Sequence, residues 1–417
     1  MVPNDWEVKK LEDVVSKRRK ITYGIVVPGP YEPNGNLMIR AKDYSFGWQP
    51  IESIYRVSDK MHQSYKRSQV RKGDVLLTIV GSIGNTAIVP EGLEGANITQ
   101  QTARLSFDEH DANFFYSIMS SEIGKKEIYR YAKSGVQPSL NLADIAKFKI
   151  PVPPFPEQQK IAKILSTWDN AISTTERLID NSTQQKKALM QQLLTGKQRL
   201  FDDEGKRFKG DWDEVTIDST FKLITDYVAS GSFASLKENV NVSDDEGYAH
   251  YVRQTDLAAK FKNKTLKWVN EDSYSYLKKS NLYEGDILFT NIGDLGKVFY
   301  MPKLEKPATV APNLIVLRVN QKNNSKYIFY MLSSYVGQRQ INRIKSGTGL
   351  PKINKTEFKT MRFKIPRLEE QQKVATVLTN ADKEIELLEQ QLSDLQQEKK
   401  ALMQVLLTGK VRVVVDG

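Results

Sequence analysis

Two long segments of the chain follow unbroken steps of three and four residues, and most of the positions so marked are apolar. Alternating steps of three and four are typical of a heptad seam along an α-helix. We therefore expect two long helices, each with one apolar stripe. The predicted seam residues are Ile161, Leu165, Trp168, Ile172, Ile179, Leu189 and Leu193 in the first segment and Val374, Leu378, Ile385, Leu388, Leu392, Leu395, Leu402 and Leu406 in the second.

Helix-boundary residues stand at both ends of each segment. Pro precedes them in VPPFPEQ and IPRLEEQ, and Glu occupies the first turn, where the positive end of the helix dipole favours it. Each segment closes on LLTG, so Gly196 and Gly409 are the predicted left-handed caps, followed by Lys197 and Lys410. Roughly 40 residues at ~1.5 Å each make rods of about 60 Å.

Two arrangements could bury such a stripe: a single helix lying on its own domain, or the two helices lying against each other. An antiparallel pair within the chain is the favoured interpretation, because a compact domain covers a stripe of about 60 Å less easily than a matching helix does. Polar seam positions would then set the register of the pair, at some cost in stability. They are Thr175, Ser182, Lys186 and Lys399.

The two segments are copies of each other. A shift of 213 places residues 157–200 on residues 370–413 without a gap, with 22 of 44 positions identical, and KKALMQQLLTGK differs from KKALMQVLLTGK at one. The preceding regions repeat as well: GDVLLTIVGSIGN matches GDILFTNIGDLGK, SGVQPSLN matches SGTGLPKIN, and DWEV matches DWDEV. The chain is therefore a tandem duplication of a globular unit followed by a helix.

Each globular unit mixes short strand-like runs with helical stretches. DVLLTIV, TARLSF, DILFTNI and LIVLRV are typical strands, whereas ANFFYSIMSSEIGKKEIYRY and KYIFYMLSSYVGQRQINRI are predicted to be helical. This mixture indicates an α+β class, with domains at 1–152 and 199–365 and the repeated helices at 153–198 and 366–417. ITYGIVVPGPYEPNG and DYVASGSFASLKENV hold equivalent positions but differ, as expected of one scaffold with two targets.

Charge favours a polyanionic partner. Lys and Arg number 61 against 50 Asp and Glu, giving a net charge of +11. Basic residues are interleaved with aromatics and amides in SKRRK, SYKRS, KKEIYRYAK, YLKKS and QRQINRIK. Any one run could be a solvated helix face, but their recurrence in both halves favours contacts with DNA phosphates and bases.

Several classes of site are made improbable by what the chain lacks. It has no cysteine and only three widely spaced histidines, so a metal cluster is not expected. No leader and no long apolar run are evident, so we expect a soluble chain of a reducing cytoplasm without a membrane contact. Turns at GSIG and GDLG lack the phosphate-loop spacing, and no cofactor fingerprint or catalytic triad is found in both halves.

Taken together, these motifs resemble the specificity subunits of type I restriction-modification enzymes. The resemblance rests on IPVPPFPEQQKIAKIL, on LLTGKQRL followed by a tryptophan start, on the paired GDVLLTIVGSIGN and GDILFTNIGDLGK segments, and on the two SG segments. It covers nearly the whole chain twice. One departure is the second junction, IPRLEEQQK, which lacks the double proline.

The resemblance implies two α+β target recognition domains related by pseudo-two-fold symmetry and joined by an antiparallel coiled coil. Each domain would read one half of a split double-stranded DNA target, and the helix pair would set the half-site spacing. No catalytic activity and no cofactor are implied for this chain. The implied partners are two methyltransferase subunits, which use S-adenosylmethionine, and two restriction subunits, which use ATP and magnesium.

Candidate DNA-binding residues come from the repeated Arg-x-x-Asp pattern, the ANITQQ and APN stretches, and the SG segments. They are Arg40, Lys42, Gln100, Gln101, Lys133, Ser134 and Gln137 in the first half and Arg253, Asn313, Lys345, Thr348 and Lys352 in the second. Asp43 and Asp256 are expected to be structural. Two other hypotheses stay open: a self-sufficient methyltransferase or nuclease, and an interaction protein whose helices pair between chains.

Overall fold

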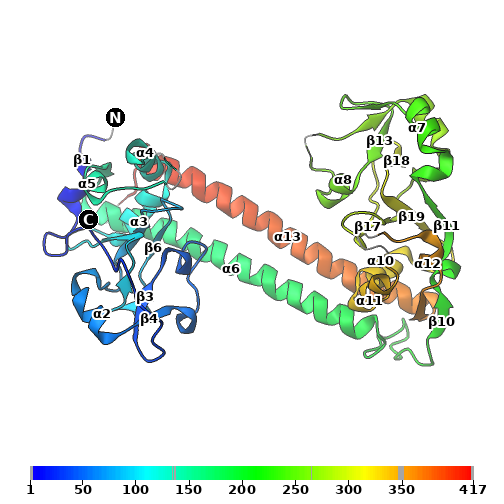
Figure 1. Ribbon diagram of the computed structural model, residues 1–417, viewed down its shortest axis with the longest axis horizontal. Coiled ribbons are helices and arrows are strands. Elements are labelled where there is room, and N and C mark those ends of the chain that lie inside the picture. Colours follow the sequence, from blue (N-terminus) through cyan, green and yellow to red (C-terminus); the bar gives the residue numbers. More distant parts are fainter. Residues whose placement is uncertain (1–2, 134, 136–137, 264, 346–351, 415–417) are drawn as a thin grey trace. The chain divides into compact units, whose positions relative to one another are not determined.

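The computed structural model describes the whole chain except residues 1–2, 134, 136–137, 264, 346–351 and 415–417 (Figure 1). Its contacts divide the chain into two compact units. Unit 1 is Met1–Arg177 with Glu389–Gly417, and unit 2 is Leu178–Leu388. The two long helices are α6 (Phe155–Leu193) and α13 (Leu368–Leu406). One part of each helix belongs to unit 1 and the other part to unit 2.

Unit 1 combines short strands with short helices. Its strands are β1 (Glu7–Lys10), β2 (Thr22–Tyr23), β3 (Asn36–Ile39), β4 (Tyr55–Val57), β5 (Val75–Thr78), β6 (Thr86–Ile88), β7 (Asn97–Ile98), β8 (Thr102–Leu105) and β9 (Lys149–Val152). Its helices are α1 (Leu11–Val14), α2 (Asp59–Ser64), α3 (Ala112–Ser120), α4 (Glu122–Tyr131) and α5 (Leu142–Ala146). One sheet has the order β2-β8-β5-β6, another has the order β4-β3-β7, and β1 pairs with β9.

Unit 2 repeats this plan with more strands. Its strands are β10 (Asp213–Thr216), β11 (Phe221–Asp226), β12 (Val242–Ser243), β13 (Ala249–Val252), β14 (Trp268–Val269), β15 (Asn281–Leu282), β16 (Ile287–Thr290), β17 (Val298–Tyr300), β18 (Ala308–Val310), β19 (Leu314–Val319) and β20 (Arg362–Ile365). Its helices are α7 (Phe233–Asn239), α8 (Gln254–Ala258), α9 (Glu271–Tyr276), α10 (Ser325–Ser333), α11 (Tyr335–Arg343) and α12 (Lys355–Lys359). The sheets have the orders β11-β19-β16-β17 and β12-β14-β13-β18-β15, and β10 pairs with β20.

The same pairings therefore recur in both units, and the predicted α+β class is confirmed. Each unit has an antiparallel four-stranded sheet and a second sheet, of three strands in unit 1 and five in unit 2, that contains one parallel pair: β3 with β7 and β13 with β18. The central strand of the larger sheet lies between two cores: Val75 and Leu77 of β5 face one, and Leu76 faces the other. Burial on both faces explains why the middle of DVLLTIV, residues 75–77, is a continuous apolar run.

The long helical stretches predicted in each unit are each broken into two helices. Ser121 separates α3 from α4, and its hydroxyl accepts a hydrogen bond from the Ile123 amide at 3.1 Å. At Gly124, an added Cβ would lie 2.4 Å from the Met119 carbonyl oxygen, so only glycine allows α4 to pack this closely on the end of α3. Ser334 and Gly337 make the equivalent break between α10 and α11.

In unit 1, the first part of α6 and the last part of α13 run antiparallel. Lys399 of α13 forms an ion pair with Asp169, and Arg412, beyond the end of α13, bonds Glu157 in the first turn of α6 through two contacts of 2.7 and 2.8 Å. Glu157 is buried, and its carboxylate also accepts a hydrogen bond from the Trp6 indole at 3.0 Å. One buried carboxylate thus joins three parts of unit 1.

In unit 2, the remaining parts of the same helices also run antiparallel. Lys186 of α6 pairs with Asp382, and Arg199 bonds both oxygens of the buried Glu370 at 2.5 and 2.6 Å. The equivalent indole, Trp212, differs from Trp6, because its buried Nε1 has no hydrogen-bond partner. The ion pairs place Lys186 and Lys399 where their charges are matched by a carboxylate.

The residues of the predicted seam lie on α6 and α13. Each apolar seam residue is buried or half-buried, and Leu165 and Leu378 are fully buried. Leu193 and Leu406 are the last residues of α6 and α13. Gly196 and Gly409 have φ of +70° and +71°, which confirms the predicted left-handed caps.

Candidate nucleic-acid interface

Four of the candidate residues of unit 1 line one pocket. It measures about 300 Å³ and lies at the ends of β3 and β8. Its lining consists of Arg40, Lys42, Gln100 and Gln101 together with Ile25, Val26, Pro28, Met38 and Thr99. Two cations and two amides therefore share a concave surface with several apolar groups, which suits contacts with both phosphates and base edges.

Backbone hydrogen bonds bring these residues together. The Thr99 amide donates to the carbonyl of Ile39, which directly precedes Arg40, at 3.2 Å. The Gln100 amide donates to the Ile25 carbonyl at 2.9 Å. Hydrogen bonding between the β3 and β7 segments thus continues past the ends of both strands. This continuation places the two glutamines beside the arginine.

Arg40 is held by the carboxylate of Asp43. Its Nε and one terminal nitrogen bond the two carboxylate oxygens at 3.1 and 3.0 Å, and its backbone amide donates to the same group at 2.8 Å. The guanidinium also lies 5.2 Å from the centre of the Tyr55 ring. Asp43 is buried and acts as an anchor, whereas the Arg40 side chain remains partly exposed.

Unit 2 holds Arg253 in the same way. Asp256 accepts from Nε at 3.0 Å and from a terminal nitrogen at 2.7 Å, and that nitrogen also donates to the Thr265 carbonyl at 2.6 Å. Burial acts to raise the pKa of Asp256, but hydrogen bonds from Arg253 and Asn263 outweigh it and hold the pKa below its usual value. The pair is therefore charged at neutral pH.

The SG segments join the same region. In unit 1, the Ile79 amide donates to the Gln101 carbonyl at 2.8 Å, and the Leu140 amide donates to the Ile79 carbonyl at 2.9 Å. Lys133 is exposed and pairs through its backbone with Ser139. Gln101 and Lys133 thus flank the segment that follows β5.

The equivalent region of unit 2 has the same connections. The Asn291 amide donates to the Asn313 carbonyl at 3.2 Å, and the Ile353 amide donates to the Asn291 carbonyl at 3.1 Å. Ile292 forms a bridge with Lys352. Asn313 is exposed with a φ of +71° and Lys352 is exposed as well, so both lie on one rim after β16.

The remaining candidates are less well placed. Lys345 is exposed two residues after the end of α11, and no described contact ties its side chain to Asn313. Ser134, Gln137 and Thr348 lie outside the described residues. Val26 and Pro28 also belong to the pocket but were not predicted, because the divergence of ITYGIVVPG between the halves was the only signal for them in the sequence.

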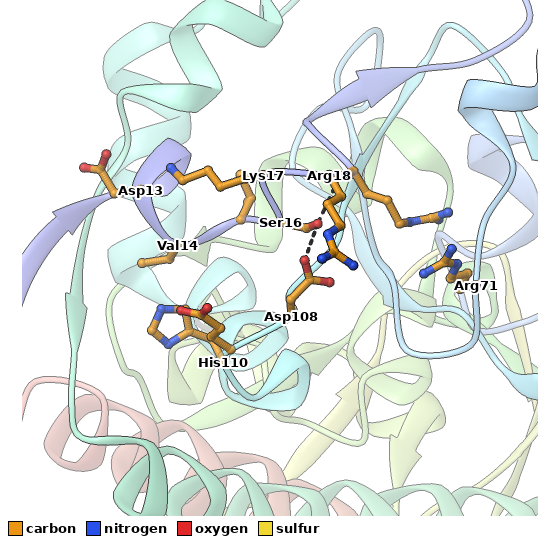
Figure 2. Close-up of a pocket in the computed structure, with 11 residues that line it drawn as sticks. Asp13, Val14, Ser16, Lys17, Arg18, Arg71, Asp108 and His110 are labelled. Carbon is orange, nitrogen blue, oxygen red and sulfur yellow. Dashed lines mark hydrogen bonds between the residues drawn. The ribbon is translucent and has the colours of Figure 1, made fainter.

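A second pocket of unit 1, of about 500 Å³, contains a serine, a histidine and an aspartate (Figure 2). Ser16 donates its hydroxyl directly to Asp108 at 2.5 Å, and Figure 2 shows the His110 ring apart from that bond. Gln158 donates to Nδ1 of His110 at 3.1 Å, and burial lowers the pKa of this histidine. His110 thus does not bridge Ser16 and Asp108, so these residues form no nucleophilic triad.

Two features are absent from the part of the chain that the structure describes. No cluster there of three or more His, Asp or Glu side chains could hold a metal ion. No helix there combines the length and apolar character that crossing a bilayer requires.

Comparisons with known proteins agree with this architecture. The model of the type I restriction modification DNA specificity domain matches twice, over residues 3–181 and 209–397. Two Methanocaldococcus jannaschii proteins are similar along their length: the putative MjaX specificity subunit is 28% identical, covering 99% of this chain and 95% of that protein, and the MjaVIII specificity subunit is 25% identical, covering 99% and 94%.

Solved structures share the fold. The crystal structure of a type I restriction-modification S subunit from M. genitalium superposes with a TM-score of 0.59 at 16% identity, covering 98% of both chains. A chain from a study of assembly and conformational transition in a type I restriction-modification system superposes with a TM-score of 0.58 at 15% identity, covering 99% of this chain and 100% of that one. Because the family model matches each half of the chain, and the two matches together cover most of the sequence, the chain belongs to the type I restriction-modification DNA specificity family.

Proposed function

We propose that this chain is the DNA-specificity subunit of a type I restriction-modification complex. The observation that carries the proposal is the shared rim: in each unit, an anchored arginine and exposed amides and lysines lie at the ends of equivalent strands. The loops that complete the rim differ between the units. Each unit would therefore read a different half of a split DNA target.

In this role the chain recognises DNA and performs no chemistry. Residues 1–152 and 199–365 would be the two target recognition domains, and residues 153–198 and 366–417 the spacer helices with the terminal tail. The helix pair would set the distance between half-sites and dock two methyltransferase subunits. Those subunits would bring S-adenosylmethionine, and two restriction subunits would bring ATP and magnesium.

Methylome mapping tests the proposal in cells that express this chain with its cognate methyltransferase. The expected result is adenine methylation within two short motifs separated by a fixed gap. A single continuous palindrome, or no sequence-dependent methylation, would contradict it.

The purified chain provides the matching control. Incubated alone with labelled S-adenosylmethionine and mixed-sequence DNA, it should transfer no methyl group, whereas added methyltransferase subunits should restore transfer. Methyl transfer by the chain alone would favour the self-sufficient enzyme, and light scattering showing a stable dimer of isolated chains would favour helices that pair between molecules.

A further inference from the structure

Phe46 of unit 1 is almost entirely exposed to solvent. Its relative exposure is 95%, and among the described residues no large apolar side chain exceeds it. It lies in the turn that follows the short 3-10 helix η1 (Ala41–Asp43), which carries Lys42. Water around a whole phenyl ring is unfavourable, so its position calls for an explanation beyond folding.

The turn that carries Phe46 is firmly held. Ser45 bonds the Ala41 carbonyl twice, through its amide at 3.1 Å and its hydroxyl at 2.7 Å. The Asn85 side chain donates to the Ser45 hydroxyl at 3.1 Å. Gly47, with a φ of +89°, allows the chain to reverse directly after the phenylalanine.

The two aromatic neighbours of Phe46 in the chain fix the base of the turn. Tyr44 is buried, and its hydroxyl lies 2.9 Å from that of Thr78 and 3.0 Å from that of Thr102. The Trp48 indole donates to the Ile88 carbonyl at 3.1 Å, and the two rings lie 5.7 Å apart. Phe46 is thus presented outward by a rigid support, which keeps the ordering cost of any contact small.

The surroundings of the turn favour a nucleic acid over a protein as the partner of Phe46. Lys42 and Arg40, which line the candidate pocket, precede it by four and six residues. Val27, 71% exposed, follows Val26 of the same pocket. Apolar groups beside cations suit a surface that contacts both phosphates and bases. Proteins that bend DNA insert phenylalanine wedges between base steps.

We infer that Phe46 is a wedge that enters or stacks on the base stack of the half-site read by unit 1; this rests on the proposed function. Unit 2 provides a contrast within the chain. The residue six positions after its anchored arginine is Ala259, which is half-buried. The equivalent position of unit 2 therefore carries no wedge, and the inference concerns the half-site read by unit 1.

The test uses the complex of this chain with its methyltransferase subunits and a duplex that carries both half-sites. 2-Aminopurine replaces one base at a time, outside the methylated adenines, and its fluorescence reports unstacking. The wild-type complex should brighten the probe at one step of the unit 1 half-site. Phe46→Ala should abolish that signal and weaken binding by about 5- to 150-fold, whereas Phe46→Trp should keep both.

Controls separate the wedge from other roles. Val8→Ala trims an apolar side chain that is 56% exposed on β1 of unit 1, outside every candidate DNA-binding run, and should leave signal and affinity unchanged. A duplex with a mismatch at the brightened step should bind Phe46→Ala nearly as well as wild type does. Equal losses on matched and mismatched DNA, or failure of Phe46→Ala to assemble with the methyltransferase, would overturn the inference. If wild type methylates no bipartite target, the proposed function fails instead.

Discussion

At the scale of single residues, the repeated arginines are held in place by the repeated aspartates. Arg40 and Arg253 were predicted to contact DNA because they recur, and the structure shows each bound to a neighbouring buried aspartate. Recurrence identifies residues that both units share, and both units share the aspartate that holds the arginine. Side chains that distinguish two targets must differ between the units, so the repeat alone could not find Val26 or Phe46.

Lys42 and Gln100 are expected to play different parts in DNA binding. Gln100→Ala should cost about 1 to 3 kcal/mol on the cognate base pair and relax specificity there. Lys42→Ala should weaken all sequences alike and reduce the salt slope by about one unit. Binding of the assembled complex to cognate and substituted duplexes, measured across a salt series, checks both.

Lys72 is the matched control for Lys42. It is an exposed lysine of the same unit that is paired with Glu91 outside the pocket. Lys72→Ala should leave the salt slope unchanged. A slope that falls equally in both variants would mean that Lys42 acts only through net charge.

The Arg253–Asp256 pair gives a pH dependence with a definite sign. The pKa of Asp256 is lowered in the folded protein, so the carboxylate adds stability above its unfolded pKa of about 3.9 and loses it as the pH falls through the folded value. The difference in melting temperature between wild type and Asp256→Asn should be constant from neutral pH down to about pH 5 and shrink below about pH 4. A difference that grows on acidification would contradict the assignment.

At the scale of elements, periodicity predicted the long helices and strands well. Heptad spacing and glycine caps located α6 and α13, and apolar runs located β5 and β16. The break between α3 and α4 was missed, because local composition there favours one helix. Close packing of Gly124 on the end of α3 decides the matter, and only the fold reveals that contact.

In unit 2, α13 should stabilise the fold mainly through the residues of its seam. Leu378 is 0% exposed and belongs to the core, whereas Leu387 on the same helix is 71% exposed. Leu378→Ala should lower the free energy of unfolding by about 2 to 5 kcal/mol. Leu387→Ala should change it by no more than about 0.5 kcal/mol. Denaturant unfolding of both variants measures the contrast, and similar losses would argue against the predicted seam.

At the scale of the whole molecule, duplication explains why one chain has two similar units with different rims. Sequence comparison of the halves predicted this organisation, because the scaffold strands and helices retained their pattern. It could not predict how each rim is shaped, since the divergent loops depend on contacts such as that between Asn85 and Ser45. The scaffold was thus far more predictable than the site.

The proposed spacer role can be tested by lengthening both helices together. Adding one heptad to α6 and one to α13 keeps the seam in phase and extends each helix by about 10 Å. The methylated target should then keep both half-sites and widen its gap by about three base pairs, at ~3.4 Å each. Unchanged spacing would show that the helices do not set the gap.

Backbone hydrogen bonds, rather than side chains, position Gln100, Gln101 and Asn313 on their rims. A substitution of one of these side chains therefore leaves intact the backbone hydrogen bonds that position it. New target preferences can arise one amino acid at a time, without rebuilding the core and without altering the surfaces that partner subunits would use. Such a rim is open to diversification by single substitutions.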